Sequence, residues 1–175
     1  MRDRKLFLTT ILPICLALSG CYEMDAPLIE KGERGDIAYR YNCTMKMDGK
    51  TKPIQIREEN IGSWYSSNYK YRMDGDTVVL KQLEKNRYVA QIGDRPPFKI
   101  ALATIEKDYI TIGVANVMNK NLEIERIRSK NSIELKPINA ERIRLEGKND
   151  KIVEFLKEHT GDLVYSVMGC ARIGD

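Results

Sequence analysis

The chain has 175 residues, with 29 basic and 25 acidic side chains and a formal net charge of +4. This near balance argues against nucleic acid as a partner, because proteins that bind it concentrate basic residues on one surface. The part of the chain beyond residue 20 is long enough for a single domain with one real core.

The chain opens with a basic segment, residues 1–5, and an apolar run from Leu6 to Leu18 that contains Pro13. A run of this length is typical of a secretory signal and is shorter than the roughly 20 residues of a membrane-spanning helix. It ends in Leu18-Ser19-Gly20-Cys21. This motif resembles the lipobox of bacterial lipoproteins, in which small residues precede a cysteine that becomes lipidated.

The resemblance implies an address and an anchor in the bacterial cell envelope. Residues 1–20 would be removed as a signal peptide, and Cys21 would carry the acyl chains that hold the protein on the membrane. Tyr22, rather than Asp, follows this cysteine, which favours the outer membrane facing the periplasm over the inner membrane. Cys15 is the competing cysteine, but Ile14 places a bulky residue where the motif needs a small one.

Two of the four cysteines, Cys43 and Cys170, remain after signal cleavage and acylation. Extracytoplasmic compartments favour disulfides, so we predict a bond that ties the first strand to the last segment. Two buried free thiols, or one thiol bonded to another molecule, are the alternatives.

Residues 21–35 follow as a predicted flexible tether, because they contain Pro27, Gly32 and Gly35 and show no periodicity. Residues 36–175 form one predicted globular domain of short alternating runs separated by turn signals such as Asp74-Gly75. The predicted strands are 37–47, 52–57, 66–73, 77–83, 87–92, 98–104, 109–114, 122–128, 133–137, 142–145 and 163–168.

The spacing of about 8–12 residues between turns predicts a mainly β fold, an antiparallel barrel or sandwich. One short C-terminal helix is predicted, beginning at Asn149 or Asp150 and ending before Gly161. In it Phe155 and His159 recur at helical spacing.

Few residues offer catalytic or metal-binding chemistry, and we predict neither a metal nor a cofactor. His159 is the only histidine, which excludes multi-histidine metal sites. Its place near a helix C-terminus indicates a partly exposed imidazole with a structural role. Four carboxylates resemble solvated loop and turn residues more than a converging catalytic pair: Glu58, Glu59, Asp74 and Asp76.

The candidate binding surface is a group of aromatic residues, because tyrosine and tryptophan dominate recognition surfaces. Its members are Trp64, Tyr65, Tyr69 and Tyr71. Tyrosines also fill β cores, which is the alternative. A second candidate is an outward basic face for acidic envelope polymers, with a solvated sheet face as its alternative. Its members are Lys136, Arg142 and Arg144.

These observations predict a non-enzymatic envelope lipoprotein, a binding or structural module for an envelope protein or for peptidoglycan. A second hypothesis is a lysozyme-type inhibitor, because Tyr41-Asn42-Cys43 resembles the start of those small barrels, although their Ser/Gly-rich inhibitory loop is missing. A third is a carboxylate-dependent cell-wall hydrolase that would use the four carboxylates named above.

Overall fold

The computed structural model describes residues 22–46, 49–63, 67–115, 122–139 and 142–173. They form eleven strands, two α-helices and a short 3₁₀ turn at Gly161–Leu163. The strands are β1 (Tyr22–Met24), β2 (Arg40–Met45), β3 (Thr51–Asn60), β4 (Tyr69–Met73), β5 (Asp76–Glu84), β6 (Arg87–Ile92), β7 (Phe98–Glu106), β8 (Tyr109–Ala115), β9 (Glu134–Pro137), β10 (Ile143–Glu146) and β11 (Val164–Arg172). The helices are α1 (Leu122–Asn131) and α2 (Asn149–Lys157).

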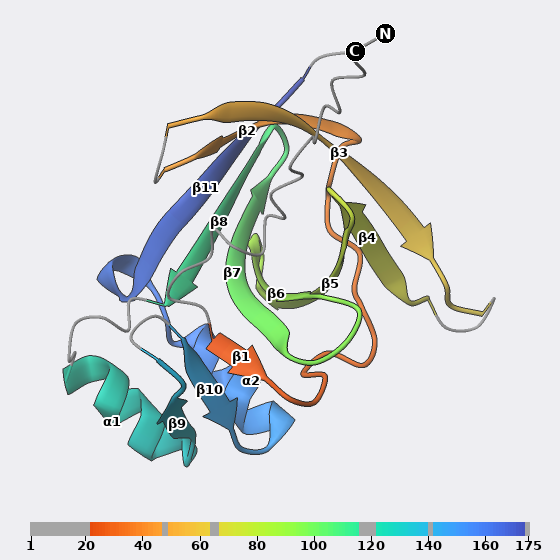
Figure 1. Cartoon of the computed structure of the whole chain (residues 1–175). Coiled ribbons are helices and arrows are strands. Elements are labelled where there is room, and N and C mark those ends of the chain that lie inside the picture. The colour runs from red at the N-terminus through yellow and green to blue at the C-terminus, as the bar shows by residue number, and fades with distance from the viewer. Residues whose placement is uncertain (1–21, 47–48, 64–66, 116–121, 140–141, 174–175) are drawn as a thin grey trace, which may run out of the picture.

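Eight of the strands form a closed antiparallel β-barrel (Figure 1). Each strand from β2 to β7 pairs with the next one along the chain, and β11 pairs with both β8 and β2 to close the ring. Closure leaves no free edge within the ring. The prediction of a mainly β fold, an antiparallel barrel or sandwich with a short C-terminal helix, is therefore confirmed, and of the two architectures the structure has the barrel.

The turn between β4 and β5 shows how the sequence fixes the register of a hairpin. Asp74 and Gly75 have positive φ angles, 53° and 93°. Two consecutive residues with positive φ are required by the type I′ turn, which matches the twist of the flanking strands. The Asp-Gly pair supplies this conformation at low cost, so the hairpin predicted here is confirmed.

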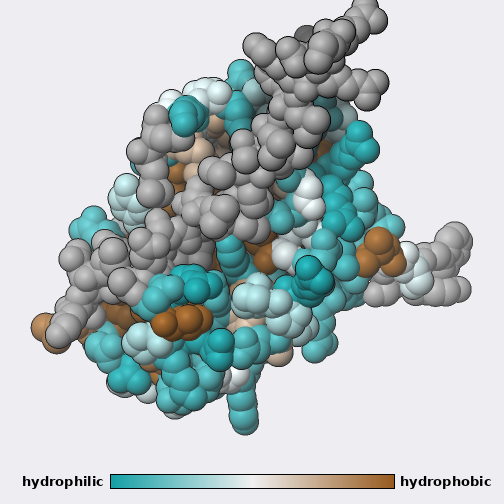
Figure 2. Space-filling view, viewed as in Figure 1, coloured by the Kyte–Doolittle hydropathy of each residue, from teal (hydrophilic) through white to brown (hydrophobic). Residues whose placement is uncertain are grey.

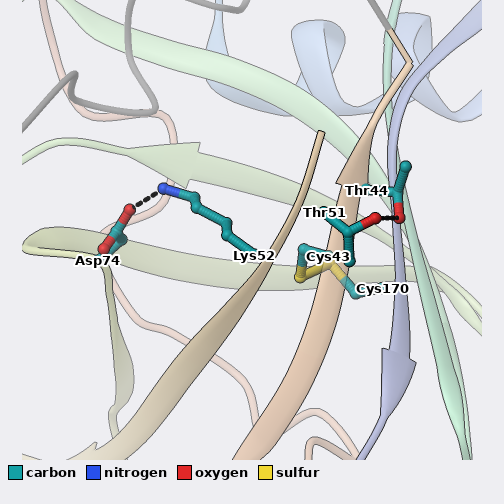
Figure 3. The surroundings of a disulfide bond; sticks show 6 residues. All are labelled: Cys43, Thr44, Thr51, Lys52, Asp74 and Cys170. Atoms are coloured by element: carbon teal, nitrogen blue, oxygen red, sulfur yellow. Dashed lines mark hydrogen bonds and ion pairs between the residues drawn. A yellow bond between two sulfur atoms is a disulfide. The ribbon is translucent and has the colours of Figure 1, made fainter. Parts of the chain in front are cut away.

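The seam between β2 and β11 carries the disulfide. Cys43 and Cys170 are directly opposite each other in the antiparallel register, and their sulfur atoms are 2.11 Å apart (Figure 3). On the neighbouring strand pair, the hydroxyls of Thr44 and Thr51 lie 2.7 Å apart. The pairing of the two cysteines, which join the first barrel strand to the last, agrees with the prediction.

A three-stranded ribbon extends the sheet beyond the barrel. At the start of β7, residues 98–100 pair with β1, which is parallel to β10, and β10 pairs in turn with β9. Figure 1 shows this ribbon gathered with α1 and α2 at one end of the barrel. Among the described residues, no helix is long and apolar enough to cross a membrane.

The predicted strand at 122–128 is wrong, because this segment belongs to helix α1. The alternation of Leu122-Glu-Ile-Glu resembles a strand, but Ile124, Ile127 and Asn131 are the buried residues, at the three- and four-residue spacing of a helix face. Salt bridges between residues three apart, Glu123 with Arg126 and Glu125 with Arg128, support the helix on its exposed side. The described part of the chain therefore has two α-helices where one was predicted.

The strands β5, β6 and β7 are buried on both faces and separate two hydrophobic cores. Side chains on their inner face, such as Leu80 and Ala103, fill the barrel core, which also contains both cysteines. Side chains on their outer face, such as Val89 and Ile100, belong to an outer core. Both helices contribute to that outer core, for example through Phe155.

The predicted tether is also wrong, because residues 22–39 are part of the folded domain. Tyr22 is 1% exposed in β1, and Leu28 and Ile29 are each 4% exposed in the outer core. We call residues 25–39 the strap. The backbone N–H groups of Leu28 and Ile29 both donate to Oε1 of Gln91, at 2.7 and 2.9 Å.

Gly32, one of the residues that suggested a flexible tether, is required for close packing of the strap on the barrel. Gly32 donates its N–H to Oδ1 of Asn68 and accepts a hydrogen bond from the N–H of Tyr69. A Cβ atom at Gly32 would lie 2.0 Å from the carbonyl oxygen of Tyr69, so only glycine allows this approach. The next residue, Glu33, donates its N–H to the carbonyl of Leu80 on β5. Gly32 therefore marks a contact between strap and barrel.

Candidate functional site

The strap crosses the barrel wall at a group of polar and aromatic residues that we call the mouth site. Its members are Arg34, Gly35, Glu58, Tyr69 and Tyr71. Arg34 lines two surface hollows, of about 390 and 260 Å³. Residues of the strap line both of them, so the strap shapes this surface.

Tyr71 ties the strap to the barrel. Its side chain is 1% exposed, and its hydroxyl accepts a 2.8 Å hydrogen bond from the N–H of Gly35. The hydroxyl also lies 3.4 Å from a carboxylate oxygen of Glu58. Burial raises the pKa of Tyr71 to about 12, so the hydroxyl stays protonated and serves as a neutral hydrogen-bonding group.

Arg34 is the most exposed charged group of the mouth site. Its Nε donates to Glu58 at 3.1 Å, while two thirds of its side chain remains exposed. The hydrogen bond and the charge of Glu58 raise the pKa of Arg34. The guanidinium lies 5.7 Å from the ring centre of Tyr69, a cation–π contact that leaves the charge open to solvent. This arrangement suits recognition of a polar or anionic group.

A small apolar cavity of about 40 Å³ lies beneath the mouth site, inside the barrel. Aliphatic side chains line most of it, and Tyr71 is shared between this cavity and the smaller hollow. Such a volume is far below the 300 Å³ or more of a typical small-molecule pocket. Recognition in this conformation would therefore use the outer surface.

Of the aromatic residues predicted to form a binding surface, Tyr69 is partly accessible and Tyr71 is buried. Tyr71 belongs to the barrel core, so its assignment to a binding surface is wrong, for the reason that its side of β4 faces inward. Tyr69 is half-buried and lines the larger hollow. Trp64 and Tyr65 lie outside the described residues, as does Cys21.

Three of the predicted candidate carboxylates are paired with cations. Glu58 bonds Arg34, Glu59 lies 3.8 Å from Arg72, and Asp74 bonds Lys52 (Figure 3). Glu58 and Glu59 are consecutive in β3, so their side chains point to opposite faces of the sheet and cannot converge on one cleft.

His159 is fully buried, which corrects the expectation of a partly exposed imidazole. Its Nδ1 lies 2.8 Å from the carbonyl oxygen of Phe155, so this nitrogen carries the hydrogen and donates it. The other nitrogen, Nε2, then accepts from the hydroxyl of Tyr22 at 3.3 Å. Burial lowers the pKa of His159, which therefore favours the neutral form. The histidine joins α2 to β1.

The predicted basic face is neutralised by ion pairs. Lys136 contacts Glu146 at 2.5 Å, Arg144 contacts Asp25 at 3.1 Å, and Arg142 contacts the buried Glu23 at 3.4 Å. These pairs link the ribbon strands to one another and to the chain that leaves β1. The interpretation as a free basic surface for acidic polymers is therefore wrong.

The face of the molecule seen in Figure 2 is mostly hydrophilic, with a few separate hydrophobic residues.

Two residues with structural roles were not identified from the sequence. Gln91 accepts the two strap hydrogen bonds described above, and Arg87 donates to the carbonyls of Lys157 and His159, at 3.2 and 2.6 Å, at the end of α2. Gln91 occupies an outer-face position of β6, but only the fold shows that the strap covers that face.

Within the described ranges, no three histidine, cysteine, aspartate or glutamate side chains are close enough to hold a metal ion. Comparisons with protein-family models, with curated proteins and with solved structures found no match to this chain.

Proposed function

We propose that this chain is a lipid-anchored lipoprotein of the bacterial envelope whose barrel is a non-catalytic binding module for an envelope protein or a cell-wall component. The accessible part of the mouth site, which is Arg34 with the partly exposed Glu58 and Tyr69, is its recognition surface, and the buried Tyr71 supports it from beneath. The observation that carries the binding role is the exposed Arg34 guanidinium between two hollows, held by Glu58 and Tyr69.

The anchor is proposed from the motif at residues 18–21, which resembles a lipobox. Two or three acyl chains give stable attachment without a spanning segment. The pairing of Cys43 with Cys170 across β2 and β11 suits an oxidising compartment outside the cytoplasm.

The non-catalytic role is proposed because the most reactive side chains already stabilise the fold. His159 is buried between Phe155 and Tyr22, and its lowered pKa disfavours the charged form that a proton shuttle needs. Cys43 and Cys170 are bonded to each other, so neither offers a thiolate.

Lipid labelling tests the anchor. Cells that express the full chain are grown with a labelled fatty acid, and the protein is recovered from membrane fractions. Cys21→Ala should lose the label and accumulate uncleaved, whereas Cys15→Ala is the matched control and should keep it. Equal labelling of the two variants would contradict the anchor.

Crosslinked pull-downs test the binding role. The mature chain is captured from envelope extract, and bound peptides and wall fragments are identified by mass spectrometry. Arg34→Ala and Tyr69→Ala should lose a partner that Tyr165→Ala retains, because Tyr165 is an exposed tyrosine on β11, outside the mouth site. Activity in cell-wall zymograms, or stoichiometric inhibition of lysozyme, would instead support the hydrolase or the inhibitor hypothesis.

A further inference from the structure

Strand β1 begins immediately after the predicted acylated cysteine. Tyr22 is paired on one side with Ile100 of β7 and on the other with Ile143 of β10, and it is 1% exposed. A trans peptide places the Cα atom of Cys21 about 3.8 Å from that of Tyr22. An extended tether of residues 22–35 would instead have reached up to roughly 50 Å. The predicted lipidated residue is therefore joined directly to the folded domain, with no flexible segment between them.

The sheet register identifies the surface next to the anchor. Because β10 is parallel to β1, the start of β10 lies beside Tyr22, and Pro137 at the end of β9 is opposite Ile143. Neighbouring strands are about 4.8 Å apart, so Pro137 lies roughly 10 Å from Tyr22. We call the exposed residues Pro137, Ile138 and Asn139 the membrane tip.

We infer that the membrane tip lies against the lipid surface, held there by the acyl chains on Cys21. This inference rests on the proposed lipid anchor. Ile138 is 37% exposed, and its N–H donates to the carbonyl of Arg142, next to the start of β10, at 2.9 Å. An aliphatic residue at this position gains by entering the boundary between headgroups and acyl chains.

The same geometry directs the mouth site away from the membrane. Gly35 of the mouth site lies beside Ile105, since a Cβ atom there would be 3.2 Å from the Ile105 Cδ1. Tyr22 is opposite Ile100, five residues earlier on the same strand. At about 3.3 Å per residue, the two positions are roughly 17 Å apart along β7. A rigidly seated barrel would thus present its recognition surface toward the periplasm.

Fluorescence quenching in vesicles tests this orientation. The lipidated protein is reconstituted into phosphatidylcholine vesicles whose acyl chains carry bromine, which quenches tryptophan fluorescence. Trp64→Phe first removes the single native tryptophan, so that each variant contains only the tryptophan introduced at the tested position. Ile138→Trp reports from the membrane tip. Ile61→Trp is the matched control, because Ile61 is an exposed isoleucine that follows β3. We expect the emission at position 138 to be quenched roughly twofold or more relative to position 61, since an interfacial ring meets the bromines.

Two further measurements separate the possible failures. Mass spectrometry of Cys21 in the same preparation reports acylation, and its absence would refute the proposed anchor. Acylation with equal quenching at positions 138 and 61 would overturn the orientation alone. A Gly/Ser spacer inserted between Cys21 and Tyr22 should remove the difference, and a difference that persists would show that the short anchor does not set the orientation. Circular dichroism checks that each variant is folded.

Discussion

The barrel core and the outer core are built from different kinds of contact. The barrel core is formed by apolar side chains and the Cys43–Cys170 pair, inside a ring of strands that closes on itself. The barrel core does contain buried tyrosine hydroxyls such as that of Tyr71, whereas the buried amide and imidazole side chains of Gln91, Asn131 and His159 lie on or beside the outer core. Each of these makes a hydrogen bond to the backbone of another residue.

The two cores are specified by different interactions. A closed ladder of backbone hydrogen bonds fixes the barrel strands, so alternating apolar side chains suffice inside it. The strap and α2 have no such ladder to the barrel, and a buried polar group must find a partner or cost about 1–3 kcal/mol. Gln91 and His159 therefore fix the strap and the helix at one position on the barrel surface.

Removal of the disulfide should have the largest effect, and it should affect the barrel core. The bond joins residues 127 apart in sequence, so its loss releases a long loop in the unfolded chain. The double variant Cys43→Ala/Cys170→Ala should lose about 4–5 kcal/mol of unfolding free energy. Urea unfolding measures this change. Reductant should destabilise the wild-type protein and leave the double variant unchanged; an equal response of both proteins would contradict the role of the bond.

Replacement of Gln91 by Leu should have an intermediate effect, confined to the outer core. Two buried N–H groups, those of Leu28 and Ile29, would lose their acceptor. We expect a loss of about 2–3 kcal/mol and faster hydrogen exchange at both amides. Gln82→Leu is the matched control, because Gln82 is an exposed glutamine of β5 whose side chain bonds the carbonyl of Lys85 and not the strap. If both variants lose the same stability, Gln91 does not hold the strap.

The smallest predicted effect is a pH dependence from His159. Burial lowers its pKa in the folded protein below the ordinary value of about 6.5. Between these two pKa values the unfolded chain binds a proton that the folded protein does not. Stability from this group is therefore complete above about pH 6.5 and declines as the pH falls, by at most about 1.4 kcal/mol per pH unit.

His159→Phe keeps an aromatic ring against Phe155 and should abolish this slope. The measurement is the difference in unfolding free energy between the two proteins from pH 5 to pH 7, which cancels the carboxylates that both share. A difference that does not change over this range would refute the buried neutral histidine.

The sequence alone determined the strands of the barrel, its hairpin turns and the cysteine pair. Period-two alternation and turn residues such as Asp74-Gly75 act locally, over a few neighbouring positions, and local chemistry is visible in a sequence. The same reasoning predicted C-terminal helix α2 from its spaced apolar residues.

The positions of the strap, α1 and the mouth site depend on long-range packing that the sequence pattern does not show. Residues 22–35 look flexible by composition, yet Gln91, more than 60 residues away, accepts hydrogen bonds from Leu28 and Ile29 and holds this segment on the barrel. In 122–128 the alternation resembles a strand, and packing on the outer core favours a helix instead. Tyr69 and Tyr71 share one face of β4, but barrel closure buries Tyr71 and leaves Tyr69 beside a hollow. Such outcomes depend on contacts between distant segments, which form only when the barrel closes.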